Sequence, residues 1–321
     1  MAKTVLVTGG AGFIGSHVAD RFLAAGWQVT VLDDLSSGRE ENIASDVNFI
    51  RGDITTPDAA ELVKNGRFDV LCHLAAQIDV RRSVLDPVYD ATRNILGTLN
   101  LLEAIRSSGH DTRVVFSSTG GALYGDFDAP PSGELNEKNP EAPYGIGKLA
   151  VEYYLAYYGR VHGVTTVALR YGNVYGPRQD PHGEAGVVAI FCNRLLDGRA
   201  MTVFGDGEQT RDYVYAGDVA AANFAAATQD LPKTGRLDAR AFNIGTGIET
   251  SVNTVARTLQ KAAGVDTPID YAPARAGELA RSALDTAKAQ RDLGWKPTVS
   301  LQEGLERTFK FFADRRATAV A

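Results

Sequence analysis

The chain of 321 residues is 44% hydrophobic and 22% charged, and its 39 acidic and 33 basic side chains give a net charge of −6. This composition is typical of a soluble globular protein with an ample core, and the acidic excess argues against a nucleic-acid surface. No apolar run approaches the length of a membrane span, and the N-terminus leads directly into a predicted strand. We therefore expect a cytoplasmic protein without a membrane partner.

A short apolar run at residues 5–8 breaks into glycines at Gly9, Gly12 and Gly15 and then continues with a helical pattern. This pattern predicts a strand, a tight turn and the start of a helix. Glycine is needed there because a pyrophosphate must approach the backbone closely, and a Cβ would block the ligand or the packing of the helix. The N-terminus of the helix then offers N–H groups to the anion. The turn therefore predicts a dinucleotide-binding site.

A second predicted strand, at residues 29–33, ends in Asp33. It follows the glycines at the distance where a carboxylate can accept hydrogen bonds from the adenosine ribose hydroxyls. This favours NAD over NADP. Arg39 lies just downstream and could meet a 2′-phosphate, so the choice of cofactor stays open to a binding test.

From residue 4 to about residue 170, short β-rich runs alternate with amphipathic helical patterns, which predicts βαβ units and a parallel sheet. The fold class is therefore α/β, with a Rossmann-type doubly wound sheet. Further strands are expected near residues 47–50, 70–74, 113–116 and 166–169, with helices over about 80–108 and 144–162. Asp53 and the residues 74–76 follow strand ends, at the edge where ligands of open sheets bind.

Beyond Asn173 the pattern changes to shorter elements separated by glycine and proline. We predict an NAD-binding domain over residues 1–172 and a smaller, mainly substrate-binding domain over 173–321. Strands near 212–215 and 241–244 and a helix over 216–227 predict that the chain crosses back into the first domain. Two helical stretches are expected in the tail, on either side of residues 294–297.

The cysteines and histidines do not form a metal-binding pattern. Cys72 falls in a predicted strand and Cys192 in a predicted helix, where small apolar side chains are needed. The five histidines are scattered, with no spacing that would place two on one helical face. We therefore expect no metal.

Two side chains at the start of the helix over 144–162 have the chemistry of an acid–base pair. Tyr144 and Lys148 lie four residues apart and share one helical face. A phenol becomes a usable base when its anion is stabilised, as a neighbouring ammonium and the positive nicotinamide ring would do. The strand before this helix ends in three hydroxyl residues, and we assign Thr119 to the substrate hydroxyl. At least one of Ser117 and Ser118 is expected to satisfy only local groups.

These residues resemble the extended short-chain dehydrogenase/reductases, and within them the nucleotide-sugar 4-epimerases similar to UDP-glucose 4-epimerase. The resemblance covers nearly the whole chain. It rests on Thr8-Gly-Gly-Ala-Gly-Phe-Ile-Gly15, His73-Leu-Ala-Ala76, Ser117-Ser-Thr119, Tyr144 with Lys148, Arg170-Tyr-Gly-Asn173, Val203-Phe-Gly-Asp206, Arg211-Asp-Tyr213, and Arg275 with Glu278.

The resemblance implies two sets of ligand contacts. The contacts to NAD would come from Gly9, Gly12, Phe13, Ile14, Gly15, Asp33, Asp53, Ile54, Leu74, Ala75, Ala76, Asn94, Ser117, Tyr144 and Lys148. The contacts to a UDP-sugar would come from Thr119, Asn173, Val188, Phe204, Arg211, Tyr213, Arg275 and Glu278. Two arginines can neutralise a diphosphate in an otherwise acidic protein. A homodimer through helices near 94–106 and 149–158 is also implied.

Three positions bear on the substrate. Thr119 stands where many relatives have serine, and Gly172 stands where an aromatic residue is common in UDP-galactose epimerases. The glycine is expected to open space near the nicotinamide. Ser282 aligns with a gate beside the sugar C2 substituent, where a small residue would leave room for an N-acetyl group.

The implied reaction is transient oxidation of the sugar at C4, rotation of the 4-keto sugar, and return of the hydride to its other face. The alternatives are a nucleotide-sugar 4,6-dehydratase, a UDP-glucuronate epimerase or decarboxylase, and a non-catalytic NAD-binding protein. Dehydratases of the family usually place acidic residues just after the strand-end hydroxyl. Residues 119–125 supply none, which disfavours elimination.

Overall fold

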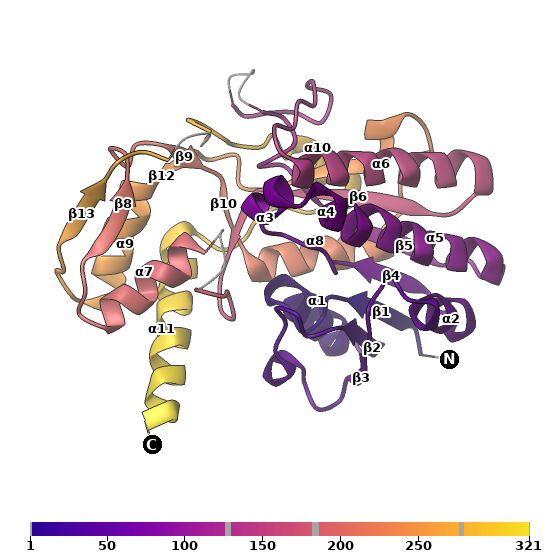
Figure 1. Cartoon of the computed structure of the whole chain (residues 1–321), viewed down its shortest axis with the longest axis horizontal. Helices are drawn as coiled ribbons and strands as arrows, with labels where there is room; N and C mark the ends of the chain where they lie inside the picture. Colours follow the sequence, from indigo (N-terminus) through magenta and orange to yellow (C-terminus); the bar gives the residue numbers. More distant parts are fainter. Residues whose placement is uncertain (1, 126–129, 182–185, 276–278, 321) are drawn as a thin grey trace.

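The computed structural model describes residues 2–125, 130–181, 186–275 and 279–320. Seven strands form its central sheet: β1 (Thr4–Thr8), β2 (Gln28–Asp33), β3 (Asn48–Arg51), β4 (Val70–His73), β5 (Arg113–Thr119), β6 (Thr166–Tyr171) and β11 (Ala241–Ile244). Their order is β11-β6-β5-β4-β1-β2-β3, and all are parallel (Figure 1). This confirms the predicted α/β fold. Between β1 and β4 the chain changes winding direction, which opens a crevice at their carboxyl ends.

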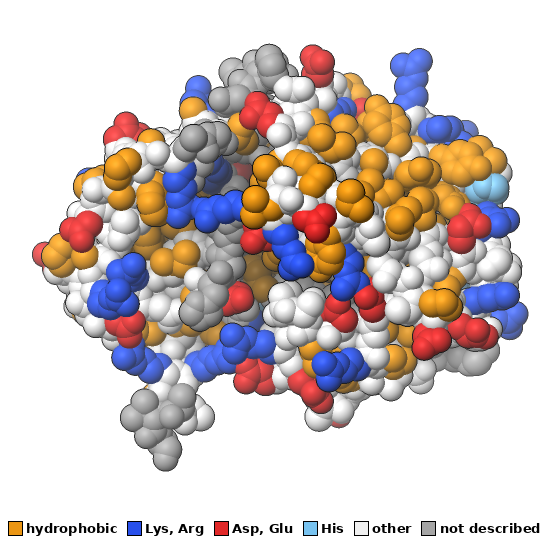
Figure 2. Space-filling view, viewed as in Figure 1, with side chains coloured by type: hydrophobic (Ala, Val, Ile, Leu, Met, Phe, Trp, Pro, Cys, Tyr) orange, Lys and Arg blue, Asp and Glu red, His pale blue; other side chains and the backbone are white. Residues whose placement is uncertain are grey.

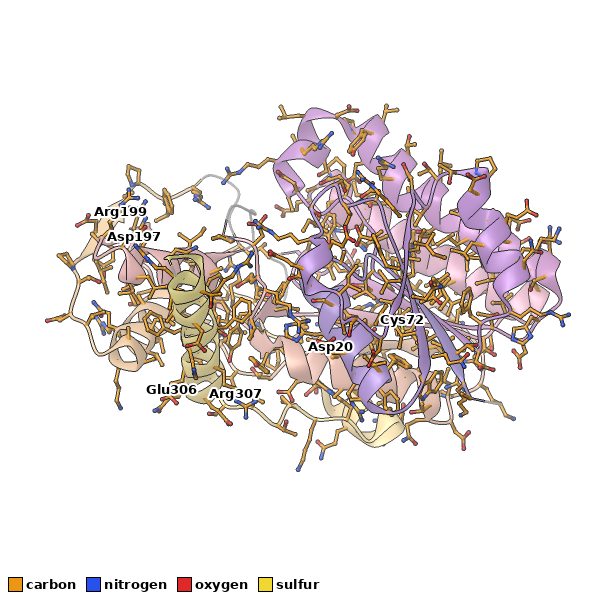
Figure 3. All side chains as sticks on the ribbon, turned by 90° about the horizontal axis from the view of Figure 1, so that it is seen from below. Asp20, Cys72, Asp197, Arg199, Glu306 and Arg307 are labelled. Atoms are coloured by element: carbon orange, nitrogen blue, oxygen red, sulfur yellow. The ribbon has the colours of Figure 1, made fainter. Side chains whose placement is uncertain are left out.

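Helices cover both faces of the sheet. One face carries α1 (Phe13–Ala24), α8 (Ala216–Thr228) and α10 (Ala287–Leu293), and the other carries α2 (Pro57–Gly66), α5 (Gly97–Ser108) and α6 (Pro143–His162). Because both faces are buried, the strands are nearly continuous apolar runs, and every residue of β6 is buried. Cys72 lies among these strands (Figure 3) and is a buried free thiol.

A smaller unit lies beside the sheet (Figure 1). It packs α7 (Val187–Leu196), α9 (Val252–Ala263) and α11 (Leu301–Val320) around the parallel pair β8 (Met201–Phe204) and β13 (Ile269–Ala272). Two short pairs connect the units: β7 (Asn173–Tyr175) with β10 (Tyr213–Tyr215), and β9 (Thr210–Arg211) with β12 (Thr250–Ser251). Cys192 is buried in the core of this unit. No helix of the described residues is both long and apolar enough for a bilayer crossing.

The single helix expected over residues 80–108 is wrong, because Pro87 interrupts it. The chain forms α3 (Val80–Leu85), α4 (Pro87–Ala91), the π-helical turn η2 (Thr92–Leu96) and then α5. A residue before proline avoids the helical region, and Asp86 has φ −140° and ψ 78°. Its carboxylate accepts the N–H of Tyr89 at 2.9 Å and so caps α4. Two 3-10 turns, η1 (Glu40–Asn42) and η3 (Leu237–Arg240), complete the elements.

Two contacts anchor the loop after β7 to α1 and so bring the smaller unit against the glycine turn. His17 donates from Nε2 to the carbonyl of Pro177 at 2.9 Å. Arg178 pairs with Asp20 at 2.6 Å, and Figure 3 shows Asp20 on the α1 side of the sheet. Burial lowers the pKa of His17, so the hydrogen bond is made by the neutral imidazole. The loop therefore lies beside the mouth of the crevice.

Candidate active site

The glycine turn after β1 is shaped by close backbone contacts. Gly9 has φ +72°, and a Cβ there would lie 2.6 Å from the backbone nitrogen of Ala75. A Cβ on Gly15 would overlap the carbonyl of Gly9. Helix α1 starts at Phe13 without a side-chain cap, so the N–H groups of its first turn face the crevice without an intrahelical partner. An anion fits this turn.

Asp33 closes the same end of the crevice. Its carboxylate accepts the N–H groups of Ala11 at 3.0 Å and Leu35 at 2.8 Å. Burial raises the pKa of Asp33, although these hydrogen bonds act against that shift. Arg39 is half exposed and pairs with Glu41 at 3.7 Å. The glycine turn and an acid at the end of β2 therefore fit the pyrophosphate and adenosine ribose of NAD.

Asp53 lies just beyond β3 and is held by Thr55 and Arg93. Thr55 donates to the carboxylate from its N–H and its hydroxyl, each at 2.9 Å, and Arg93 forms an ion pair with it. Partial burial raises the pKa of Asp53, but these donors outweigh it and lower the pKa below its ordinary value. Ile54 is buried against Gly97. Sequence reasoning missed Arg93, which lies forty residues away.

Asn94 holds the loop that follows β4. Its Oδ1 accepts the N–H of Gln77 at 2.8 Å, and its Nδ2 donates to the Gln77 carbonyl and to Asp90, each at 3.0 Å. Leu74, Ala75 and Ala76, which precede Gln77, are half-buried at the crevice edge. Asn94 thus shapes the edge where these residues lie. Sequence reasoning missed Gln77 and Asp90, although an Asp four residues before an Asn in a helical pattern is a usable signal.

His73 links three elements beneath the crevice. Thr98 donates to the carbonyl of Asn94 at 2.6 Å, so its oxygen accepts from His73 Nε2 at 2.9 Å. The Thr8 hydroxyl then donates to His73 Nδ1 at 2.7 Å. Burial, together with the charge of Lys148, lowers the pKa of His73 to about 3. The imidazole is therefore a neutral connector and not an acid–base group.

Tyr144 and Lys148 lie in the first two turns of α6. Lys148 Nζ donates to the carbonyl of Ser117 at 2.7 Å and lies 5.8 Å from the ring centroid of Tyr144. Burial raises the pKa of Tyr144 to about 12, and the charge of Asp90 acts in the same direction. Burial lowers the pKa of Lys148 to about 8, while Asp90 and Glu152 act against that shift. A phenol and an ammonium with perturbed pKa values are therefore neighbours beside the end of β5.

The three hydroxyl side chains at the end of β5 point to different faces of the sheet, because side chains alternate along a strand. Ser117 and Thr119 share one face, and Ser118 points to the other. Ser118 donates to Glu152 at 2.5 Å, so its role is structural, as expected for at least one of the two serines. The Thr119 oxygen accepts the N–H of Ala122 at 3.2 Å and keeps its proton for another acceptor.

On the substrate side, Asn173 and Val188 lie at different depths. Asn173 starts β7, and its Oδ1 lies 3.6 Å from the position of a Cβ on Gly121, in the loop after β5. The side chain of Val188 is buried in the core of the smaller unit. What Val188 can offer is a backbone N–H in the first turn of α7, where an anion is favoured.

The expected opening at Gly172 is wrong. A Cβ there would lie 2.8 Å from the carbonyl oxygen of Asp212, so the place of a side chain is filled by backbone. The buried Asp212 carboxylate accepts the N–H groups of Thr246 at 2.7 Å, Gly247 at 3.0 Å and Leu284 at 3.1 Å. Gly172 is therefore required by this close packing of segments.

The remaining predicted substrate residues lie in the smaller unit. Arg211 donates to the carbonyls of Thr210 and Leu279, each at 2.8 Å. The guanidinium of Arg275 stacks 3.8 Å from the ring centroid of Phe204. Tyr213 is buried and packs edge-on against another tyrosine. Glu278 lies outside the described residues.

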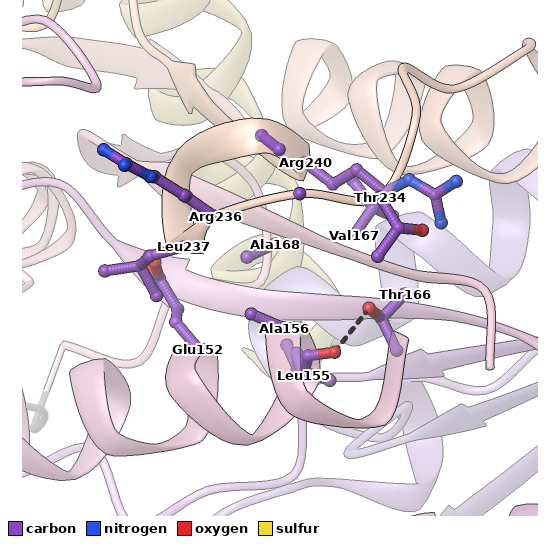
Figure 4. Close-up of a pocket in the computed structure, with 12 residues that line it drawn as sticks. Glu152, Leu155, Ala156, Thr166, Val167, Ala168, Thr234, Arg236, Leu237 and Arg240 are labelled. Carbon is purple, nitrogen blue, oxygen red and sulfur yellow. Dashed lines mark hydrogen bonds between the residues drawn. The ribbon is translucent and has the colours of Figure 1, made fainter. Parts of the chain in front are cut away.

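A small cavity lies between α6, β6 and residues 234–240 (Figure 4). Its volume is about 20 Å³, room for one water molecule. Thr166, Leu155 and Arg236 are among its lining residues, and Thr166 donates to the carbonyl of Leu155 at 2.9 Å. It is too small for a nucleotide. Within the described ranges, no three His, Cys, Asp or Glu residues gather in a metal-binding arrangement.

Residues 5–245 match the model of the NAD dependent epimerase/dehydratase family. The chain belongs to this family. The match covers the glycine turn, the acid after β2 and the Tyr144–Lys148 pair, so the resemblance inferred from the motifs is confirmed.

Similar family members match nearly the whole chain. It is 46% identical over 315 residues to a UDP-glucose 4-epimerase of Mycolicibacterium smegmatis, covering 97% of this chain and 98% of the relative. A UDP-glucose 4-epimerase of Thermotoga maritima, solved with UDP-glucose, is 45% identical, with a TM-score of 0.91 and coverage of 98% and 99%. A UDP-glucose 4-epimerase of Thermus thermophilus, solved with NAD, is 44% identical, with a TM-score of 0.88 and coverage of 97% and 99%.

Proposed function

We propose that this protein is an isomerase, an NAD-dependent 4-epimerase that interconverts UDP-glucose and UDP-galactose. The observation that carries the proposal is the meeting of three parts at one sheet edge. The glycine turn and Asp33 fit a dinucleotide, the Tyr144–Lys148 pair supplies acid–base chemistry, and Thr119 offers a hydroxyl beside them. The similarity to UDP-glucose 4-epimerases over nearly the full chain supports the choice of substrate.

The cofactor would be held from both ends of the crevice. The N–H groups of the first turn of α1 would bind the pyrophosphate, and Asp33 would accept from the adenosine ribose. Lys148 would bind the nicotinamide ribose, since its ammonium has donors beyond the one given to Ser117. The loop at 74–77, held by Asn94, would border the cofactor.

The catalytic roles follow from the chemistry of the three side chains that meet at this edge. Tyr144 removes the proton of the C4 hydroxyl, and the Thr119 hydroxyl orients that oxygen and shares its proton. The ammonium of Lys148 lowers the cost of the phenolate by its positive charge. Bound NAD would supply the site that takes up the C4 hydride and gives it back to the other face of the sugar. Tyr144 then returns the proton, so the reaction is neutral in protons and electrons.

The nucleotide would be gripped more firmly than the hexose. Arg211 and Arg275 project from the smaller unit, and the first turn of α7 adds backbone N–H groups, so these three together suit a diphosphate. A firm grip on the nucleotide and a loose grip on the sugar would permit the 4-keto ring to turn between the two hydride transfers.

Elimination would need further acid–base groups near C5 and C6. The segment after Thr119 supplies glycines, Ala122, the buried Leu123 and Tyr124. Tyr124 donates to Asn243 at 2.7 Å and accepts from Arg170 at 3.0 Å, which occupies its hydroxyl. This supports epimerisation over dehydration.

We further propose a homodimer. Exposed apolar side chains gather over the helices in the upper right of Figure 2. The helices α3, α4, η2 and α6, which pack on one another, carry exposed apolar side chains that include Leu85 at 85%, Val88 at 75% and Tyr153 at 59% exposure, and also Val84, Leu96, Tyr157 and Val161. A patch of this kind on one face is what a two-fold interface between identical chains covers. The two buried free thiols are in keeping with a reducing compartment such as the cytoplasm.

The test is to incubate the purified protein separately with UDP-glucose, UDP-N-acetylglucosamine and UDP-glucuronate, with and without added NAD, and to follow the anomeric protons by NMR. Galacto-configured signals with no change of mass are the expected result. A 4-keto-6-deoxy sugar would identify a dehydratase, and released CO2 a decarboxylase. Bound NAD without conversion of any nucleotide sugar would instead identify a non-catalytic binding protein.

A further inference from the structure

A buried carboxylate lies next to the acid–base pair and has no role in the proposed reaction. Asp90, in α4, is 1% exposed. Its Oδ1 accepts from Gln77 Nε2 at 2.9 Å and from Asn94 Nδ2 at 3.0 Å. Among the described residues, no Lys or Arg lies within ion-pair distance of it. A buried acid without a paired cation is costly to keep, so its position calls for an explanation.

The second oxygen of Asp90 faces the start of α6. A Cβ built on Gly147 would lie 3.4 Å from Asp90 Oδ2, which is a van der Waals contact. Gly147 lies between Tyr144 and Lys148 in sequence, and residues 144, 147 and 148 lie on one side of the helix. The carboxylate of Asp90 therefore lies against the turn of α6 that carries both groups.

Few other charges face this turn. On α6 itself, Glu152 faces Lys148 but is paired with the buried Arg170 at 2.6 Å. From β4, His73 is neutral. Arg93, in η2, is paired with Asp53 and Asp34. Arg82, in α3, stacks 4.1 Å from the centroid of the Tyr89 ring. Of the two acids that face Tyr144 and Lys148, Glu152 is paired with an arginine and Asp90 is not.

We propose that Asp90 is a positioning residue that supplies the negative charge facing Tyr144 and Lys148 and fixes Asn94 and Gln77 on the cofactor side. The proposal rests on the proposed roles of Tyr144 and Lys148. One carboxylate thereby connects the loop that borders the cofactor with the helix that carries the acid–base groups. It keeps the ammonium of Lys148 charged in a buried place and keeps the phenol of Tyr144 protonated until the cationic nicotinamide ring is present.

Removal of the Asp90 charge should change the pKa values of Tyr144 and Lys148 in the same direction. A negative neighbour favours the protonated form of both a phenol and an ammonium. Asp90→Asn keeps the acceptor for Asn94 and Gln77 but removes the charge, so the pKa values of Tyr144 and Lys148 should both fall. Activity needs Tyr144 ionised and Lys148 charged. Both limbs of the pH profile should therefore move to lower pH, whereas a purely structural defect would lower the maximum and leave the limbs in place.

The first measurement is the pH profile of kcat for Asp90→Asn, Asp90→Ala and Asp90→Glu. The neutral variants should shift both limbs to lower pH by about half a unit to one unit, and Asp90→Glu should keep the wild-type positions. The matched control is Asp86→Asn, an exposed carboxylate that caps the same helix, where Asn also caps well. It should leave the profile unchanged. Limbs that stay in place in both neutral variants would overturn the proposal.

The second measurement does not depend on turnover. The pKa of the Lys148 ammonium is measured in the cofactor-free protein by NMR of isotope-labelled lysine side chains, with Lys148→Arg to assign the signal. It should be lower in Asp90→Asn than in the wild type, and an unchanged value would contradict the proposal. If Tyr144→Phe proves fully active, the assigned catalytic role fails, while this titration still decides whether Asp90 supplies the charge.

Discussion

Arg170 and Glu152 form a fully buried ion pair directly behind the acid–base residues. Arg170 Nη2 lies 2.6 Å from Glu152, and Glu152 also accepts the hydroxyl of Ser118 at 2.5 Å. Glu152 is one turn beyond Lys148 on α6, and Ser118 lies between the two other strand-end hydroxyls. The ion pair therefore joins α6 to β6, and the hydrogen bond from Ser118 joins α6 to the end of β5, where the chemistry is proposed to occur.

Replacing one residue of this ion pair should lower the free energy of unfolding. Arg170→Ala leaves the carboxylate of Glu152 buried without its cation, and we expect a loss of about 3–5 kcal/mol in the free energy of unfolding. Urea denaturation measures it. The control is Arg316→Ala, whose partner Asp197 lies 2.6 Å away on the surface and which should cost less than about 1 kcal/mol. A small loss for Arg170→Ala would show that the network relaxes around the gap.

Tyr144→Phe tests the base. It removes the group that accepts the C4 proton, so kcat should fall by about 10²- to 10⁴-fold. NAD binding, measured by the cofactor retained through gel filtration, should persist. Tyr154→Phe on the same helix, which alters a partly exposed phenol, should keep near-normal activity. Near-normal activity in Tyr144→Phe itself would refute the assigned role.

Asp33 is expected to select the cofactor. The wild type should bind NAD more tightly than NADP, because a 2′-phosphate would be repelled by the buried carboxylate. Asp33→Asn should weaken NAD binding by about 10- to 100-fold, since a hydrogen bond to a charged acceptor is worth about 1.5–3 kcal/mol. Titration calorimetry measures both cofactors. Arg39→Ala is the control, because Arg39 is half exposed and paired with Glu41. Tighter NADP binding by the wild type would reject the assignment.

Ser282 tests the breadth of substrates. It is half-buried and precedes the buried Ala283 and Leu284. If it is the gate beside the sugar C2 substituent, the wild type should epimerise UDP-N-acetylglucosamine as well as UDP-glucose. Ser282→Tyr should then lose the acetylated substrate selectively, seen as a fall in the ratio of the two kcat/KM values. An unchanged ratio would remove Ser282 from the site.

The apolar patch tests the homodimer. Val88→Glu places a charge where a second copy is proposed to pack, so the sedimentation coefficient should fall to that of a monomer. Val265→Glu is the matched control, since Val265 is an exposed valine in the smaller unit, and it should not alter the assembly. A wild type that sediments as a monomer would contradict the proposal.

Much of the fold was predictable because its signals are local. The glycine turn, the acid after β2 and the start of α6 are each encoded within a few consecutive residues, so their spacing predicts a strand, a turn or a helix directly. The same holds for the return of the chain at β11, whose apolar run predicts a buried strand. The interruption at Pro87 was also local, and it was missed because the apolar periodicity continues on both sides of the proline.

Folding in three dimensions brings groups from distant parts of the chain into one buried space. The Rossmann-type sheet and the dinucleotide motif could be predicted from the amino-acid sequence, since strands and turns depend on neighbours along the chain. Three contacts could not be predicted in this way. Gly172 packs on the Asp212 carbonyl, and Arg170 neutralises Glu152. Asp90 faces Gly147. These contacts join helices and loops far apart in sequence, and burial gives them their strength because a charge in a low-dielectric interior interacts strongly with its nearest neighbours.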